Sequence, residues 1–209
     1  MTHRPIVLGD ISLSFPHKTC FENFSAQIQP GQRIALIGNN GSGKTSLLKM
    51  ILDRIPPEVT AGTVPQTINE FDSLSGGQRF NKALSDALSR HPDVLFLDEP
   101  TNHLDRSNRR SLMRMLQNYQ GTLLVVSHDP ELLRTCTNTF WHIDQGKIQV
   151  FSGCYGDYLH ETQIRREALE QKLQNLERDK KTESDSHYHF FCIRIQLAVL
   201  FFISSRKKW

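Results

Sequence analysis

The segment at residues 38–45, GNNGSGKT, constrains the fold more than any other part of the sequence. It matches the pattern G-x-x-x-x-G-K-[ST], follows the apolar run RIALIG and precedes the helical stretch TSLLKMIL. Glycines let backbone N–H groups approach an anion, and the start of a helix adds a positive dipole. A strand, a glycine loop and a helix in this order predict a phosphate-binding loop, and therefore a nucleotide site.

The residue types of this loop also predict the role of its last members. The Lys44 ammonium is placed to bridge the terminal phosphates, and the Thr45 hydroxyl to ligate Mg²⁺. The alternative is a glycine-rich turn with an incidental lysine. The predicted nucleotide-binding residues in this segment are Gly38, Asn39, Asn40, Gly41, Ser42, Gly43, Lys44, Thr45 and Ser46.

A second segment, VLFLDEP at 94–100, is an apolar run that ends in two carboxylates. A strand of this kind places Asp98 beside the metal, while Glu99 is positioned to polarise an attacking water. A strand that ends in Asp-Glu is on its own more often only a capped strand end. Its occurrence with the phosphate loop favours the catalytic interpretation.

A third segment, LSGGQ at 74–78, leads directly into a helical stretch. Its serine and glycines suit a helix start that binds phosphate, and the alternative is an ordinary N-cap. The segment follows the phosphate loop and ends 20 residues before Asp98, and this order favours the phosphate-binding interpretation. We predict phosphate contacts from Ser75, Gly76, Gly77 and Gln78.

Apolar runs of four to six residues alternate with helical stretches from residue 6 to residue 151, which predicts an α/β fold with a largely parallel sheet. The ranges 139–144 and 147–153 are expected to form a hairpin around Gln145 and Gly146. The other expected strands are 6–15, 32–38, 94–98 and 122–127, and the expected helices are 45–55, 79–90 and 106–119.

The charge is distributed unevenly along the chain. The formal net charge of +3 comes entirely from residues 184–209, so the rest of the chain is neutral and its composition makes no case for nucleic-acid binding. One local exception is the helical stretch at 106–119. The arginines of this stretch are candidates for RNA phosphate contacts: Arg106, Arg109, Arg110 and Arg114. A solvated helix face is the favoured interpretation.

The four cysteines lie far apart and the N-terminus has no signal-peptide pattern, so we expect a reducing, cytoplasmic location. The apolar run at 190–203 is 14 residues long and contains Arg194, which is short for a membrane span. A membrane anchor is the alternative interpretation of this tail. A metal site formed by His187, His189 and Cys192 is another alternative, but it lacks a fourth ligand.

The ordered set GNNGSGKT, LSGGQ, VLFLDEP, TNHLD and VVSHD resembles the ATP-binding cassette (ABC) ATPases, over about residues 4–153. The resemblance implies an α/β P-loop NTPase fold, with ATP and Mg²⁺ as cofactors. It also implies that Phe15 stacks on adenine, that Gln66 lies near Mg²⁺, and that Asp105 is the D-loop aspartate. His128 resembles the switch histidine that senses the γ-phosphate, so the implied catalytic set is Glu99, His128 and Gln66.

The segment DEPTNHLD, followed by FSGCYGDYL and a charged helix, is similar to the ABC-F proteins, which act on ribosomes. Only seven residues separate Gln66 from Leu74, which is too short for the helical subdomain of transport cassettes. This gap is similar to the first cassette of the antibiotic-resistance branch. The alternatives are the ATP-binding subunit of an ABC transporter, with a membrane permease as partner, and an ATP-binding half without turnover.

The resemblance further implies a site shared between two cassettes, because the LSGGQ helix of one acts on ATP held by the other. We therefore expect ATPase activity only in a homodimer or with a second cassette from another chain. The expected domains are the cassette at 4–153, the start of a projecting charged linker helix at 154–185, and an irregular hydrophobic-basic tail at 186–209. The sudden end of the charged pattern suggests a truncated chain.

Overall fold

The computed structural model describes residues 3–66, 75–102 and 104–178. Its main element is a sheet of six strands in the order β4-β5-β6-β3-β7-β8, parallel except for the pairing of β7 with β8. This confirms the predicted α/β class and the hairpin around Gln145 and Gly146. The strands are β3 (Arg33–Gly38), β4 (Ala61–Val64), β5 (Val94–Asp98), β6 (Thr122–Val126), β7 (Thr139–Asp144) and β8 (Lys147–Ser152).

Side chains of the central strands alternate between two separate cores, one on each face of the sheet. In β5, for example, Phe96 belongs to the first core and Leu95 and Leu97 belong to the second. Because both faces are covered, every residue of β5 and β6 is buried, as expected for a parallel sheet. The continuous apolar runs that predicted these strands are explained by this burial.

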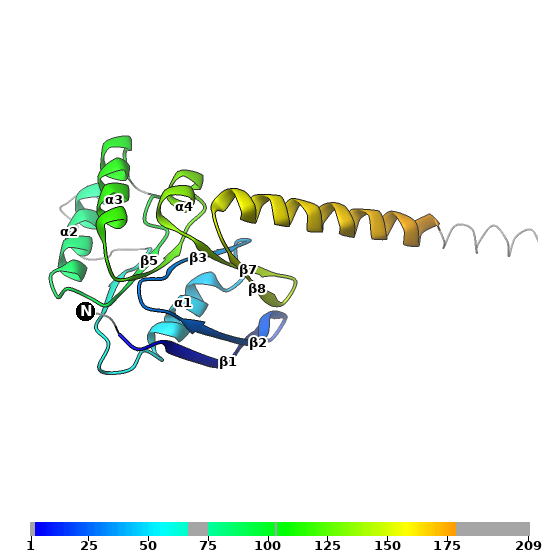
Figure 1. Ribbon diagram of the computed structural model, residues 1–209, viewed down its shortest axis with the longest axis horizontal. Coiled ribbons are helices and arrows are strands. Elements are labelled where there is room, and N and C mark those ends of the chain that lie inside the picture. The colour runs from blue at the N-terminus through cyan, green and yellow to red at the C-terminus, as the bar shows by residue number, and fades with distance from the viewer. Residues whose placement is uncertain (1–2, 67–74, 103, 179–209) are drawn as a thin grey trace, which may run out of the picture. The chain divides into compact units, whose positions relative to one another are not determined.

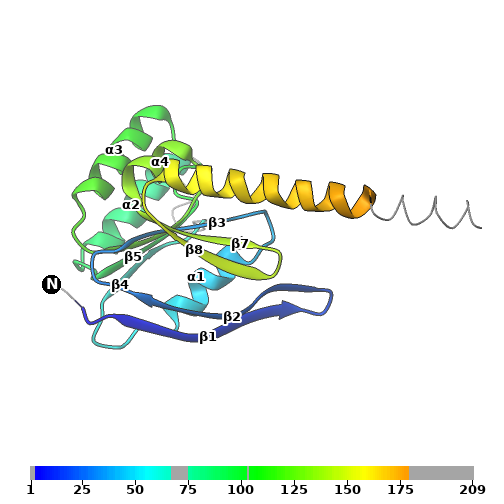
Figure 2. The ribbon, with the colours of Figure 1, turned by 45° about the vertical axis from the view of Figure 1, so that its right-hand side comes forward.

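Helices cover the sheet on both sides (Figure 1). The first core lies between the sheet, α1 (Lys44–Leu52) and a separate antiparallel hairpin of β1 (Ile6–Phe15) and β2 (Lys18–Ile28). Figure 2 shows this hairpin beyond α1. The second core lies under α2 (Gly76–Leu88), α3 (Arg106–Asn118) and α4 (Pro130–Cys136).

The parallel strands bring the predicted motifs to one edge of the sheet. In the register of the sheet, Val126 lies beside Leu36 of β3 and beside Asp98 of β5. The loops that follow β3, β5 and β6 therefore start next to one another. Ligands of open parallel sheets bind at this edge, outside the carboxyl ends of the strands.

The chain divides into two compact units, Met1–Tyr158 and Leu159–Trp209. A helix runs through 155–178, and the ion pair between Glu161 and Arg165, with 2.8 Å between Oε1 and Nη2, supports its first turns. Across the described ranges, no helix is long and apolar enough to cross a membrane. The domain boundaries stay a prediction. The shortened segment before LSGGQ, residue Leu74, and the interpretations of the tail lie outside the described residues.

Candidate nucleotide-binding site

The loop between β3 and α1 contains a left-handed backbone conformation that favours glycine. Gly43, the N-cap of α1, has a φ of 97°, in the left-handed region. A Cβ atom there would lie 2.9 Å from Cδ2 of Leu13 and 3.1 Å from Cε1 of Phe21. The β1–β2 hairpin therefore packs against this glycine, and a side chain at position 43 would meet both strain and steric conflict.

Lys44 lies inside the loop, although it is charged. Its side chain is buried, and Nζ donates to the carbonyl oxygens of Gly38 at 2.8 Å and Asn39 at 3.1 Å. Burial lowers the pKa of the Lys44 ammonium, while the negative charges of Glu99 and Asp98 act in the opposite direction. The loop therefore holds a cation at its centre, with two carboxylates nearby.

Asp98 ends β5 with an unsatisfied oxygen. Its side chain is buried, and Oδ1 has no hydrogen-bond partner among the described residues. Asp98 and Thr45 line the same cavity of about 170 Å³. A carboxylate and a hydroxyl are oxygen donors of the kind that Mg²⁺ prefers, and an orphaned buried carboxylate oxygen is costly without a ligand. The residues present therefore fit a magnesium ion.

Glu99 follows Asp98 with a left-handed backbone, at a φ of 49°. Its N–H donates to the carbonyl of Val126 at 2.9 Å, which ties the turn to β6. Its Oε1 lies 3.5 Å from Nε2 of His128. Burial raises the pKa of the Glu99 carboxyl, the charges of His128 and Lys44 oppose this rise, and Asp98 adds to it. A partly buried carboxylate with a raised pKa is suited to accept a proton.

The helices α2 and α3 both begin at a capping side chain. Ser75 Oγ accepts from the N–H of Gln78 at 3.4 Å, and Gln78 Oε1 accepts from the N–H of Ser75 at 3.0 Å, which makes a capping box. Asp105 Oδ1 accepts from the N–H of Asn108 at 2.7 Å. The residues predicted to contact phosphate at these two helix starts are Ser75, Gly76, Gly77, Gln78 and Asp105. Over the described ranges, no hydrogen bond or ion pair joins any of them to the phosphate loop at 38–46.

Phe15 and Gln66 are both exposed. Phe15 ends β1 with 54% of its surface accessible, and Gln66 lies two residues after β4. An exposed aromatic ring at the end of a strand is available for stacking on a base, and an exposed amide is available to a metal or a water. Their roles stay predictions.

Two family models match the chain: one described as "ABC transporter" at residues 21–72, and an "AAA domain" model at residues 62–134. The erythromycin resistance ATP-binding protein MsrA of Staphylococcus epidermidis is 37% identical over 173 residues, which cover 68% of this chain and 35% of MsrA. The two models together span the phosphate loop, Asp98, Glu99 and His128. The chain is an ATP-binding cassette ATPase domain.

Other comparisons agree with this assignment. The ribosome protection protein VmlR of Bacillus subtilis is 29% identical over 185 residues, which cover 74% of the cassette chain and 34% of VmlR. The cassette chain thus spans about a third of the length of these curated relatives. A dimeric post-hydrolysis structure of the ATP-binding cassette MJ0796, bound to ADP and Pi, superposes with a TM-score of 0.59 at 16% identity over 71% of this chain and 98% of that one. At this identity the likeness shows the fold.

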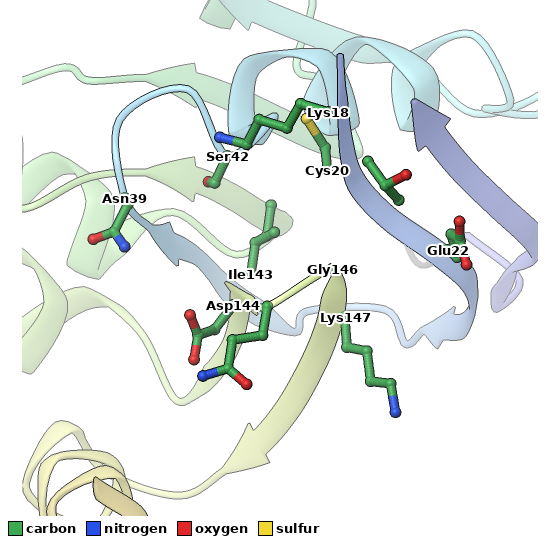
Figure 3. A pocket seen from close by; sticks show the side chains of 11 residues that line it. Lys18, Cys20, Glu22, Asn39, Ser42, Ile143, Asp144, Gly146 and Lys147 are labelled. Atoms are coloured by element: carbon green, nitrogen blue, oxygen red, sulfur yellow. The ribbon is translucent and has the colours of Figure 1, made fainter. Parts of the chain in front are cut away.

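A pocket beside the phosphate loop of the cassette was missed by the sequence reasoning (Figure 3). It has a volume of about 530 Å³ and lies between the start of β2, the loop and the β7–β8 hairpin. Lys18 extends from β2 toward Ser42, and its Nζ donates to the carbonyl of Gly41 at 3.0 Å. Nothing in the sequence marks Lys18 as a residue of this site, because its contact joins residues that are 23 positions apart.

The ion pair behind His128 was also missed. Arg109 of α3 lies 3.3 Å from Asp129, measured from Nη1 to Oδ2. Asp129 directly follows His128 and caps α4 by accepting from the N–H groups of Glu131 and Leu132. The pair therefore fixes the backbone next to the histidine that faces Glu99.

Proposed function

We propose that the chain is the ATPase module of an ABC-F-type protein, which binds MgATP and hydrolyses it together with a second cassette. The observation that carries the proposal is the partly buried Glu99 carboxylate, 3.5 Å from His128 and directly after the unsatisfied Asp98. A nucleotide-binding loop alone needs only Lys44 and the backbone of residues 38–46. Hydrolysis also needs a group that orients and deprotonates the attacking water, and Glu99 beside His128 can fill this role.

Each part of the site has a role in this proposal. The N–H groups of residues 38–46 and the Lys44 ammonium bind the β- and γ-phosphates, and Phe15 stacks on the adenine. Thr45, Asp98 and Gln66 would hold Mg²⁺, which neutralises phosphate charge when it is bound. Glu99 orients a water and takes up its proton. His128 holds the Glu99 carboxylate and responds to the γ-phosphate.

The second half of the site is proposed to come from another cassette. The residues available for this role make no hydrogen bond or ion pair to the phosphate loop within the described part of their own chain: Ser75, Gly76, Gly77, Gln78 and Asp105. The helix N-terminus at Ser75 would stabilise the γ-phosphate of ATP bound by the partner. The partner is a second copy of this chain or a cassette on another chain, and the dimeric state of MJ0796 supports this arrangement.

The ribosome is the proposed target, in the cytoplasm. Its support is the similarity to VmlR, whose name records ribosome protection, and to MsrA, whose name records erythromycin resistance. The similarity to an "ABC transporter" family model supports a second candidate, the ATP-binding subunit of a transporter.

Co-sedimentation distinguishes the two candidates. The Glu99→Gln variant should pellet with 70S ribosomes when ATP is present and remain in the supernatant without it. The Lys44→Ala variant is the matched control, because it should not bind ATP and should stay in the supernatant in both cases. Absence of pelleting with ATP, together with co-purification of a membrane permease, would support the transporter subunit instead.

A further inference from the structure

One face of α3 presents arginines to solvent. The helix contains no acidic residue and no lysine, and its apolar side chains Leu112, Met113 and Leu116 are buried against the core. Arg106, Arg110 and Arg114 follow each other at intervals of four residues and are exposed. Residues four apart lie on the same side of a helix, about 6 Å apart along its axis. Together with Arg109, these three residues form the arginine face.

The charges of this face have no partner within the protein, Arg109 excepted. In the part of the chain that the structure describes, the side chains of Arg106, Arg110 and Arg114 make no hydrogen bond and no ion pair. At the N-terminal half of α3 the face opens into a pocket of about 400 Å³. Three guanidinium groups and one carboxylate surround it, since its lining residues are Leu104, Arg106, Arg109, Arg110 and Glu131.

The residue types favour phosphate groups as the ligand of this face. The guanidinium fork of arginine matches a phosphate with two parallel hydrogen bonds, whereas lysine offers a point charge. None of the exposed large apolar side chains of the described residues lies on α3. A protein interface needs apolar or aromatic anchors at its core, and a membrane-binding helix needs an exposed apolar face. We propose that the arginine face binds the phosphate backbone of RNA.

Arg109 differs from the other three arginines, because its ion pair with Asp129 holds the start of α4 beside His128. A phosphate in the pocket therefore contacts a side chain that also supports the hydrolytic site. For this reason the test leaves Arg109 in place and changes the three unpaired arginines. The identity of the RNA rests on the proposed function, which makes it ribosomal, but the binding test needs neither ATP nor ribosomes.

The test measures the affinity for a fluorescein-labelled single-stranded RNA of 20 nucleotides by fluorescence anisotropy, between 50 and 300 mM KCl. The variant is R106Q/R110Q/R114Q. The matched control is R54Q/R90Q/K172Q, which removes the same charge from exposed positions elsewhere. Both variants keep the basic residues at 206–208. Circular dichroism and the rise in Tm on adding ATP show that both variants fold and still bind nucleotide.

Each phosphate contact contributes about 0.7 to the slope of log K against log salt for single strands. Loss of three contacts should reduce the slope by about 2 and weaken binding about a hundredfold at 0.1 M salt. The control should bind as the unchanged protein does. Equal losses in variant and control, or no loss in the variant, would overturn the proposal.

A parallel titration with a labelled poly-glutamate peptide tests the alternative partner, an acidic protein. If the variant lost peptide binding and kept RNA binding, the face would serve an acidic protein, and the RNA proposal would be wrong. ATP turnover is measured separately with a second cassette. Failure of RNA binding with intact turnover therefore refutes this inference alone, and failure of turnover with intact RNA binding refutes only the proposed function.

Discussion

Replacing Glu99 with glutamine separates binding from hydrolysis. The change keeps the shape of a side chain that is only 11% exposed, and it leaves Asp98, Thr45 and Lys44 in place for the nucleotide and its metal. It removes the group that we propose takes the proton from water. A positioned general base contributes about 10²- to 10⁴-fold in rate, which corresponds to about 3–5 kcal/mol of barrier.

The assay for Glu99→Gln combines phosphate release with ATP binding in the presence of a second cassette. Turnover should fall by about 10²-fold or more, while the dissociation constant for ATP should stay within a few-fold. Glu58→Gln is the matched control, because it makes the same chemical change at an exposed position in the same chain. Turnover that survives in the Glu99 variant would remove Glu99 from its proposed role.

The remaining predictions concern pH and the phosphate loop. Because burial raises the pKa of Glu99 above its ordinary value of 4.5, the folded state binds this proton more tightly than the unfolded state does. The unchanged protein should therefore lose stability relative to Glu99→Gln as the pH rises from the ordinary pKa through the raised one. Chemical denaturation measures the difference in the free energy of unfolding between the two proteins. The same difference at every pH would contradict a raised pKa of Glu99. Lys44→Ala should abolish the rise in Tm on adding ATP, whereas Lys172→Ala, a change at an exposed lysine, should keep it. Gly43→Ala should lower the free energy of unfolding by more than Gly41→Ala, because both backbones are left-handed but only position 43 is crowded; equal losses would show that the packing of the β1–β2 hairpin is not the cause.

The sequence predicted those parts of the fold that local physics determines. The buried runs of β5 and β6 and the glycine loop needed no knowledge of distant contacts. The helical run of α2 was predicted from residue 79, whereas the structure begins it at Gly76, directly after the serine that the sequence already indicated as a helix start. The strand β2 was missed, since its register with β1 shifts repeatedly and Asn23 has a positive φ. The helix α4 was missed because seven residues are too few to show a helical period.

The candidate site was predicted where motifs lie in single segments. Asp98 and Glu99 were found from one apolar run, and the structure adds that Glu99 faces His128. The contacts of Lys18 and the pair of α3 with the start of α4 could not be predicted, because each joins residues that only the tertiary fold brings together. The proposed role of Ser75 depends on a second cassette, so the structure of one cassette does not test it.

Two variants with complementary defects are needed to test the shared site. Lys44→Ala lacks a working phosphate loop. Ser75→Arg lacks a working helix start, because it places a bulky cation where the start of α2 would meet the γ-phosphate. Each variant should be inactive alone, and circular dichroism shows that each is folded.

Mixing these two inactive variants tests the shared site most directly. A mixed dimer contains one site with an intact Lys44 on one chain and an intact Ser75 on the other, so mixing should restore part of the activity. The activity of the unchanged protein should also rise faster than linearly with its concentration. Phosphate release that shows no recovery on mixing, with a specific activity of the unchanged protein that stays constant on dilution, would contradict the shared site.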